Sequence, residues 1–188
     1  MGYGITREAA LELVHRHLDN QNLINHSLAS EAVMRAVAAR LGEDQEQWSL
    51  AGLLHDLDSE SNPDLVTHTI ETIRILTELG VDGEIVEAIR LHNPTAHPGS
   101  ERSTRFHHAL AASETVTGLI AATALVYPDR KLASVKLKSV TKRFKEKAFA
   151  RGASREVIAE CELIGLPLAE FCAVSLAAMQ EIAAEIGL

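Results

Sequence analysis

The sequence predicts an all-α protein, a single-domain multi-helix bundle, on three observations. Hydrophobic residues make up 46% of the 188 residues and aromatic residues only 4%. Alanine and leucine dominate the apolar set, which is typical of packed helices. Apolar residues recur at spacings of three and four along most of the chain, and we find no convincing alternation of a β-strand. A chain of this length can bury one core and is short for two.

The first three expected helices have clear end signals. Thr6 can cap a helix that frays near Asn20. A second helix runs from about residue 24 to residue 41, with Gly42 placed to end it. Asp44 can cap a third helix, whose apolar residues lead directly into an adjacent imidazole and carboxylate. These signals predict a helical amino-terminal third.

The middle of the chain continues in the same way. Pro63 suits the first turn of a fourth helix that Gly80 closes. A fifth helix is expected over 82–91 and a long sixth helix over about 104–126. The intervening loop, 94–102, is rich in proline, glycine, serine and histidine, so we expect it to form a mobile rim.

The last part of the chain opens with a basic segment, residues 130–155, which contains ten basic residues and one acid. We expect a helix over about 133–149, a short helix over 154–164, and a last apolar helix that begins at Pro167. Because much of the surface of that last helix is apolar, it could close the core or meet a second copy in a homodimer.

The net charge of −8 excludes some classes of partner. Since the basic segment holds most of the positive charge, the remainder is strongly acidic, which argues against a nucleic-acid polymer as partner. No apolar run approaches the roughly eighteen residues of a membrane span, and no signal-peptide pattern opens the sequence. We therefore expect a cytoplasmic protein without a membrane partner.

The third helix ends at His55 and Asp56. Neighbouring side chains on a helix point about 100° apart, so the two can share a target only where the helix end meets a polar pocket. A metal ion is the simplest such target, because a buried carboxylate needs a cation or strong donors. The doublet alone could equally be an ordinary helix end with a hydrogen-bonded histidine and a solvated aspartate.

Further polar residues interrupt apolar helices in the same manner. Each falls near a helix end or among small residues, and imidazole with carboxylate is a ligand set for iron, manganese, cobalt, nickel or zinc. A carboxylate can also bridge two such ions, which suits attack on phosphorus. The set that we expect to hold one or two divalent ions is His26, His55, Asp56, His68, His92 and Glu114.

From about residue 22 to residue 118 the sequence resembles the HD superfamily of metal-dependent phosphohydrolases. The resemblance rests on the early His26, the His55-Asp56 doublet after a Leu-Leu run, and the later acid Glu114. His68 and His92 match two further histidines of members that hold a metal pair. The resemblance implies an HD-type bundle that holds one or two metal ions, with Asp56 as the bridge if there are two.

The resemblance also implies how the domain is organised. The HD metal-site core would cover about 22–118 of a single domain 1–188, with the basic segment and the C-terminal helices 154–188 packed on it. The runs at 117–120 and 147–150 further resemble an HDIG-type bacterial subgroup of predicted hydrolases.

The sequence departs from the family pattern at two places. Glu114 stands where the family normally has aspartate, and its extra methylene can change its distance to a metal or leave the ion to a water. Leu57-Asp58 replaces an Ile-Gly pair, which puts Asp58 and Glu60 next to the doublet. With Asp56 we take both as candidate catalytic residues that orient water or hold a ligand histidine. Alternatively, they are solvated loop residues.

We expect hydrolysis of a small phosphate ester, such as a nucleotide, by attack of a metal-bound water. The candidate residues for binding the phosphate oxygens are Lys136, Lys138, Lys142 and Arg143. The same residues could instead lie on a solvated helix. Two other functions stay open: a di-iron oxygenase on the same scaffold, and a non-catalytic nucleotide-binding module.

Overall fold

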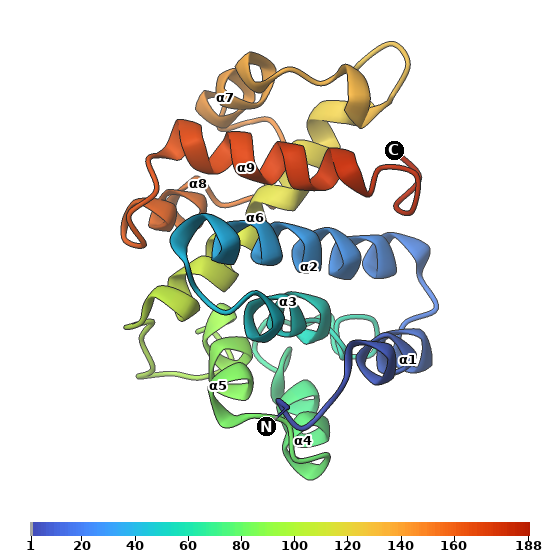
Figure 1. Ribbon diagram of the computed structural model, residues 1–188, viewed down its shortest axis with the longest axis vertical. Helices are drawn as coiled ribbons and strands as arrows, with labels where there is room; N and C mark the ends of the chain where they lie inside the picture. The colour runs from blue at the N-terminus through green and yellow to red at the C-terminus, as the bar shows by residue number, and fades with distance from the viewer. Residues whose placement is uncertain (1) are drawn as a thin grey trace.

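Two long helices, α2 (Gln21–Leu41) and α6 (Arg105–Leu125), run through the middle of the molecule, and the other helices pack around them (Figure 1). The computed structural model describes residues 2–188, and over that range it contains helices and turns but no strand. The all-α prediction is therefore confirmed. The other elements are α1 (Arg7–His17), α3 (Gln45–Leu54), α4 (Ile70–Glu78), α5 (Gly83–His92), α7 (Leu137–Lys145), α8 (Arg155–Ile158) and α9 (Leu168–Glu181), with 3₁₀ turns at Leu132–Ser134 and Ala159–Glu162.

Most predicted helix ends are confirmed, because the capping residues act locally. Thr6, Asp44, Asp82 and Thr104 each accept a hydrogen bond from a backbone N–H in the first turn of α1, α3, α5 and α6. Gly42 ends α2 in the left-handed conformation with φ of 72°. In these places the sequence signal and the structure agree to within a few residues.

The fourth helix begins later than predicted. Pro63 does not open it; residues 55–69 form turns instead, and α4 starts only at Ile70. The reason is a long-range contact, since the carboxylate of Asp58 accepts hydrogen bonds from the backbone N–H groups of Thr69 and Thr72. Asp58 thereby takes the place of a local cap, and Thr69 adopts an unusual φ of 88°.

The basic segment is less helical than predicted. A 3₁₀ turn precedes α7, which ends at Lys145 instead of near residue 149, and α8 ends at Ile158, before the predicted residue 164. The buried guanidinium of Arg155 holds the non-helical stretch in place. It donates hydrogen bonds to the carbonyl oxygens of Arg143, Phe144, Glu146, Phe149, Ala150 and Ala153.

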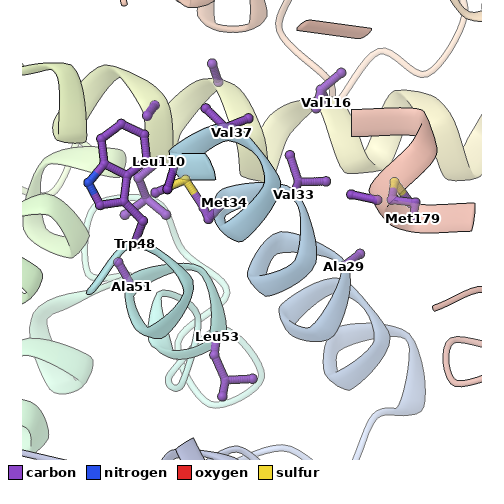
Figure 2. Packing of buried hydrophobic residues seen from close by; sticks show 14 of the residues in the cluster. Ala29, Val33, Met34, Val37, Trp48, Ala51, Leu53, Leu110, Val116 and Met179 are labelled. Carbon is purple, nitrogen blue, oxygen red and sulfur yellow. The ribbon is translucent and has the colours of Figure 1, made fainter. Parts of the chain in front are cut away.

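Helices α2 and α3 approach each other closely where Gly52 faces the backbone of Ser30. A Cβ atom added to Gly52 would lie 2.6 Å from the carbonyl oxygen of Ser30, so the two helices can approach this closely only with glycine there. Around this crossing α2, α3, α6 and α9 share one apolar core, which includes Met34, Trp48 and Met179 (Figure 2). The crossing places the carboxyl end of α3, and the two residues after it, beside α2.

One further property concerns membranes. Across residues 2–188, none of the helices combines the length and the apolar character that a bilayer span requires.

Candidate metal centre

Six side chains from five parts of the chain meet at one place. They come from the first half of α2, the two residues that follow α3, the turn before α4, the end of α5, and the middle of α6. Helix packing brings them together, since the residues are separated by up to 88 positions in the sequence. They are the six predicted metal ligands: His26, His55, Asp56, His68, His92 and Glu114.

The carboxylate of Asp56 is at the centre of four histidines. Its Oδ1 lies 3.0 Å from Nε2 of His68, 3.4 Å from Nε2 of His92 and 3.5 Å from Nε2 of His55. Its Oδ2 lies 3.8 Å from Nε2 of His26. The donors form two groups that could each hold a metal ion, His26–His55–Asp56 and Asp56–His68–His92, with the ligand atoms of each group within 4.8 Å of one another. Asp56 belongs to both groups, as expected of a bridging carboxylate.

The ring orientation of His55 and His92 follows from their second nitrogen. Nδ1 of His55 lies 2.8 Å from the carbonyl oxygen of Gly52, and Nδ1 of His92 lies 2.6 Å from that of Ile89. A carbonyl oxygen can only accept a hydrogen bond, so Nδ1 carries the proton in both rings. In the neutral form each Nε2 therefore presents a lone pair to the centre.

His26 and His68 are also oriented by a hydrogen bond from Nδ1. The hydroxyl of Thr117 donates its proton to the carbonyl of Glu114, so it accepts from Nδ1 of His26 at 2.9 Å. The carboxylate of Asp58 accepts from Nδ1 of His68, also at 2.9 Å. All four histidines thus use Nδ1 as a donor and direct Nε2 inward, which is the arrangement of metal-binding histidines.

This donor set fits divalent cations. Nε2 of His26 lies 3.1 Å from Nε2 of His55, and Nε2 of His68 lies 3.3 Å from Nε2 of His92. Lone pairs that face each other beside a carboxylate repel unless a proton or a cation lies among them. Nitrogen with carboxylate ligands suits iron, manganese, cobalt, nickel or zinc better than magnesium or calcium.

The electrostatics of the centre agree with this chemistry. Burial lowers the pKa of His55 to about 3, so its imidazole is neutral and able to bind a metal. Burial alone would raise the pKa of Asp56, but the surrounding histidines hold that pKa well below its usual range. Burial likewise opposes the charged form of His68, yet hydrogen bonds to Asp56 and Asp58 raise its pKa to about 10. A metal ion bound at Nε2 of His68 would therefore take the place of a proton.

Glu114 lies at the edge of the centre on the side of His26. Its Oε2 is 3.9 Å from Nε2 of His26, and burial raises the pKa of its carboxyl group. The longer side chain thus reaches the neighbourhood of the metal donors, although Glu114 is not part of either three-residue group.

Asp58 and Glu60 have different environments, although both were expected next to the doublet. Asp58 is buried and holds the ring of His68, one of the expected alternatives. Glu60 instead accepts hydrogen bonds from the backbone N–H groups of Asp19 and Asn20, just before α2. Asp58 therefore positions the ring of His68. Glu60 instead links its own turn to the turn before α2 at the protein surface.

The expected phosphate-binding residues are not brought to this centre. Lys136 directly precedes α7, and the other three belong to it. This helix packs on α6 and α9 and lies at the opposite end of the molecule from α4 (Figure 1). Three of the four are exposed, and the guanidinium of the fourth pairs with Glu146 and lies 4.6 Å above the ring of Phe149. The alternative of a solvated helix describes these four residues better: Lys136, Lys138, Lys142 and Arg143.

Replacing Asp58 with asparagine is expected to weaken metal binding. The amide keeps the size of the side chain but loses the charge and the second acceptor, so the ring of His68 is oriented less firmly. We expect affinity for one of two metal equivalents to fall about tenfold to 100-fold. Titration against a chromophoric chelator measures this. Asp64→Asn, in the exposed part of the same turn, is the control, and equal affinities in both variants would contradict the role.

Sequence reasoning gave no role to Thr117 or to His97. Thr117 fixes the tautomer of His26, and it lies in the run 117–120 that contributed to the family resemblance. His97 comes from the loop predicted to be mobile, and its Nε2 lies 2.8 Å from the hydroxyl of Thr69, beside His68. No spacing rule connects these residues, because each contact joins distant parts of the chain.

Comparison with known proteins gives one family. Residues 23–121 match the HD domain family. No solved structure matches the chain.

The curated relatives that match are ribonucleases Y. That of Thermosipho melanesiensis is 29% identical over 140 residues, which cover 73% of this chain and 27% of that protein. That of Thermotoga maritima is 29% identical over 164 residues, 85% of this chain and 32% of that protein. Ribonuclease Y 2 of Levilactobacillus brevis is 29% identical over 107 residues, 56% of this chain and 19% of that protein. The chain thus spans less than a third of the length of these relatives.

Proposed function

Because this chain belongs to the HD domain family, we propose that it hydrolyses a small phosphate ester with the help of divalent metal ions. The observation that carries the proposal is the inward convergence of four imidazole Nε2 atoms on the carboxylate of Asp56. The family match and the similarity to ribonuclease Y support a metal-dependent hydrolase in general. The small substrate is the more specific part of the proposal.

The ligand residues would be the four histidines and Asp56, with Glu114 beside them. Divalent ions held there would supply Lewis acidity, which lowers the pKa of water and offsets the charge of a phosphate group. Asp56 keeps its negative charge and joins the two groups of ligands. Glu114 offers a buried carboxyl of raised pKa at the edge of the centre, where it can exchange a proton with water or with the leaving oxygen.

The proposed reaction is a simple hydrolysis. An oxygen of water forms a bond to phosphorus, the bond between phosphorus and the ester oxygen breaks, and one proton of the water ends on the leaving oxygen. The products are inorganic phosphate and an alcohol. No oxidant or further reactant is needed.

Turnover by metal-loaded protein tests the proposal. The protein is stripped with chelator, loaded with Mn²⁺, Fe²⁺, Co²⁺, Ni²⁺ or Zn²⁺, and assayed for phosphate release from phosphomonoesters, including nucleoside monophosphates. We expect turnover that depends on metal and that His55→Ala abolishes. His15→Ala, at an exposed histidine of α1, is the matched control. Unchanged turnover and metal content in His55→Ala would show the proposal to be wrong.

The names of the relatives suggest a second substrate, RNA. A single-stranded oligoribonucleotide therefore belongs in the same assay. Cleavage of the oligonucleotide together with inactivity on every monoester would replace the small ester with a phosphodiester. The two other expected functions, a di-iron oxygenase and a nucleotide-binding module, gain no support from the comparisons. Oxygen consumption with iron, or ligand binding without product, would identify them.

A further inference from the structure

A pocket of about 490 Å³ opens beside the metal centre. The first half of α2, the second half of α6, and the end of α9 with the segment that follows it form its three walls. Its volume is in the range of small-molecule sites. The residues that line it are Asn22, Asn25, His26, Ala29, Thr117, Gly118, Ala121, Leu125, Met179, Ile186, Gly187 and Leu188.

The pocket and the metal centre share two residues. His26 lines the pocket and is also one of the inward-facing histidines, and Thr117 lines the pocket and holds Nδ1 of that histidine. A molecule that binds the metal centre through its phosphate can therefore place its remaining atoms in the adjoining pocket.

The walls of the pocket indicate what it can hold. Among the residues that line it there is no aspartate, glutamate, lysine or arginine side chain. Met179 and Ile186 are buried parts of the wall, and Asn25 donates a hydrogen bond to the carbonyl of Ile186, which ties the C-terminal segment to α2. A further anionic group would lose water here and find no lysine or arginine side chain to pair with. An uncharged, largely apolar group would lose little hydration free energy and would gain apolar contact area.

Gly118 lies in the interior of α6 and lines this pocket. Glycine is unfavourable inside a helix, and neither its backbone conformation nor its neighbours require it here. Its φ is not positive, and an added Cβ atom would meet no atom within 4 Å. Because Gly118 has no side chain, the pocket has open space next to α6.

We infer that this pocket binds the uncharged, largely apolar organic group of the phosphate ester, and that Gly118 sets the size of the group admitted. The inference rests on the proposed hydrolysis, because it assigns the pocket to the leaving group of that reaction. It excludes long polyanions as the preferred ligand, since their further phosphates would face aliphatic walls.

Gly118→Leu tests the inference by filling the pocket. Leucine favours helix, so α6 is expected to stay intact. We expect kcat/KM for phenyl phosphate to fall about tenfold or more, mainly through KM, while inhibition by inorganic phosphate, which has no organic group, stays unchanged. Gly83→Leu is the matched control, because Gly83 is another helical glycine with open space around it and lies outside this pocket. Equal kinetics in the two variants would overturn the inference.

A second measurement needs no turnover. Met179 lies in the pocket wall and Met34 in the core between α2 and α3, so methyl-labelled methionine gives a reporter and an internal reference. When phenol is titrated into metal-free protein, the Met179 signal is expected to shift and the Met34 signal to stay. The shift should disappear in Gly118→Leu and persist in Gly83→Leu.

The two measurements separate the inference from the proposed function. Turnover of phosphomonoesters without a shift of the Met179 signal would overturn the pocket assignment and leave the hydrolysis standing. A shift of Met179 without turnover of any phosphomonoester would overturn the assignment to a leaving group, and the proposed function with it.

Discussion

Asp56→Ala is expected to lose both metal equivalents and to reduce turnover at least about 1000-fold, which corresponds to about 4 kcal/mol of transition-state stabilisation. Asp56 is the only residue that belongs to both candidate ligand groups among the described residues. Its removal leaves four histidine nitrogens around a site without a central anion. Each group then keeps two imidazoles, which are too few to retain a divalent ion against a chelator.

Elemental analysis of untagged protein, purified without chelator, measures the metal content directly. Wild-type protein is expected to carry about two equivalents per chain, as a bridged pair requires. Asp56→Asn keeps the shape of the side chain but not its charge, so it separates a steric from an electrostatic effect. Asp19→Ala, at an exposed aspartate, is the control. Full metal content in Asp56→Ala would contradict the bridging role, and one equivalent in wild-type protein would limit the site to a single group.

Gly52→Ala is expected to destabilise the protein by about 3 kcal/mol, the upper part of the usual range for overpacking. The added methyl group would lie 2.6 Å from the carbonyl oxygen and 2.8 Å from the carbonyl carbon of Ser30. These are backbone atoms of α2, so they cannot turn aside as a flexible side chain would. Either α3 must move away from α2 or both helices must bend.

The same substitution should also reach the metal centre. The carbonyl oxygen of Gly52 accepts the hydrogen bond from Nδ1 of His55, and α3 carries His55 to within reach of His26. We therefore expect metal affinity to fall along with the free energy of unfolding in urea. Gly83→Ala adds the same methyl group at a helical glycine with no neighbour within 4 Å and should be neutral or slightly stabilising. Wild-type stability of Gly52→Ala would contradict the packing argument.

The fourth helix and the basic segment show where sequence signals fail. Pro63 is a valid local signal for a helix start, but the carboxylate of Asp58 captures the backbone N–H of Thr69 and moves the start to Ile70. In the same way Arg155 binds carbonyl oxygens at the end of α7 and in the non-helical stretch that follows it. In both places one side chain prevails over the local helix preference, because it satisfies several backbone groups at once.

The sequence by itself determined the all-α class, most helix ends, and the residue types that meet at the centre. Capping and apolar periodicity act over a few residues, so they can be read from the chain directly. Only the tertiary structure decided that Asp58 holds His68 while Glu60 caps a surface turn, that Thr117 orients His26, and that α7 lies far from α4. The physical reason is that these contacts join residues that are distant in sequence, and which of them form depends on how the helices pack, as at the close approach of Gly52 to Ser30.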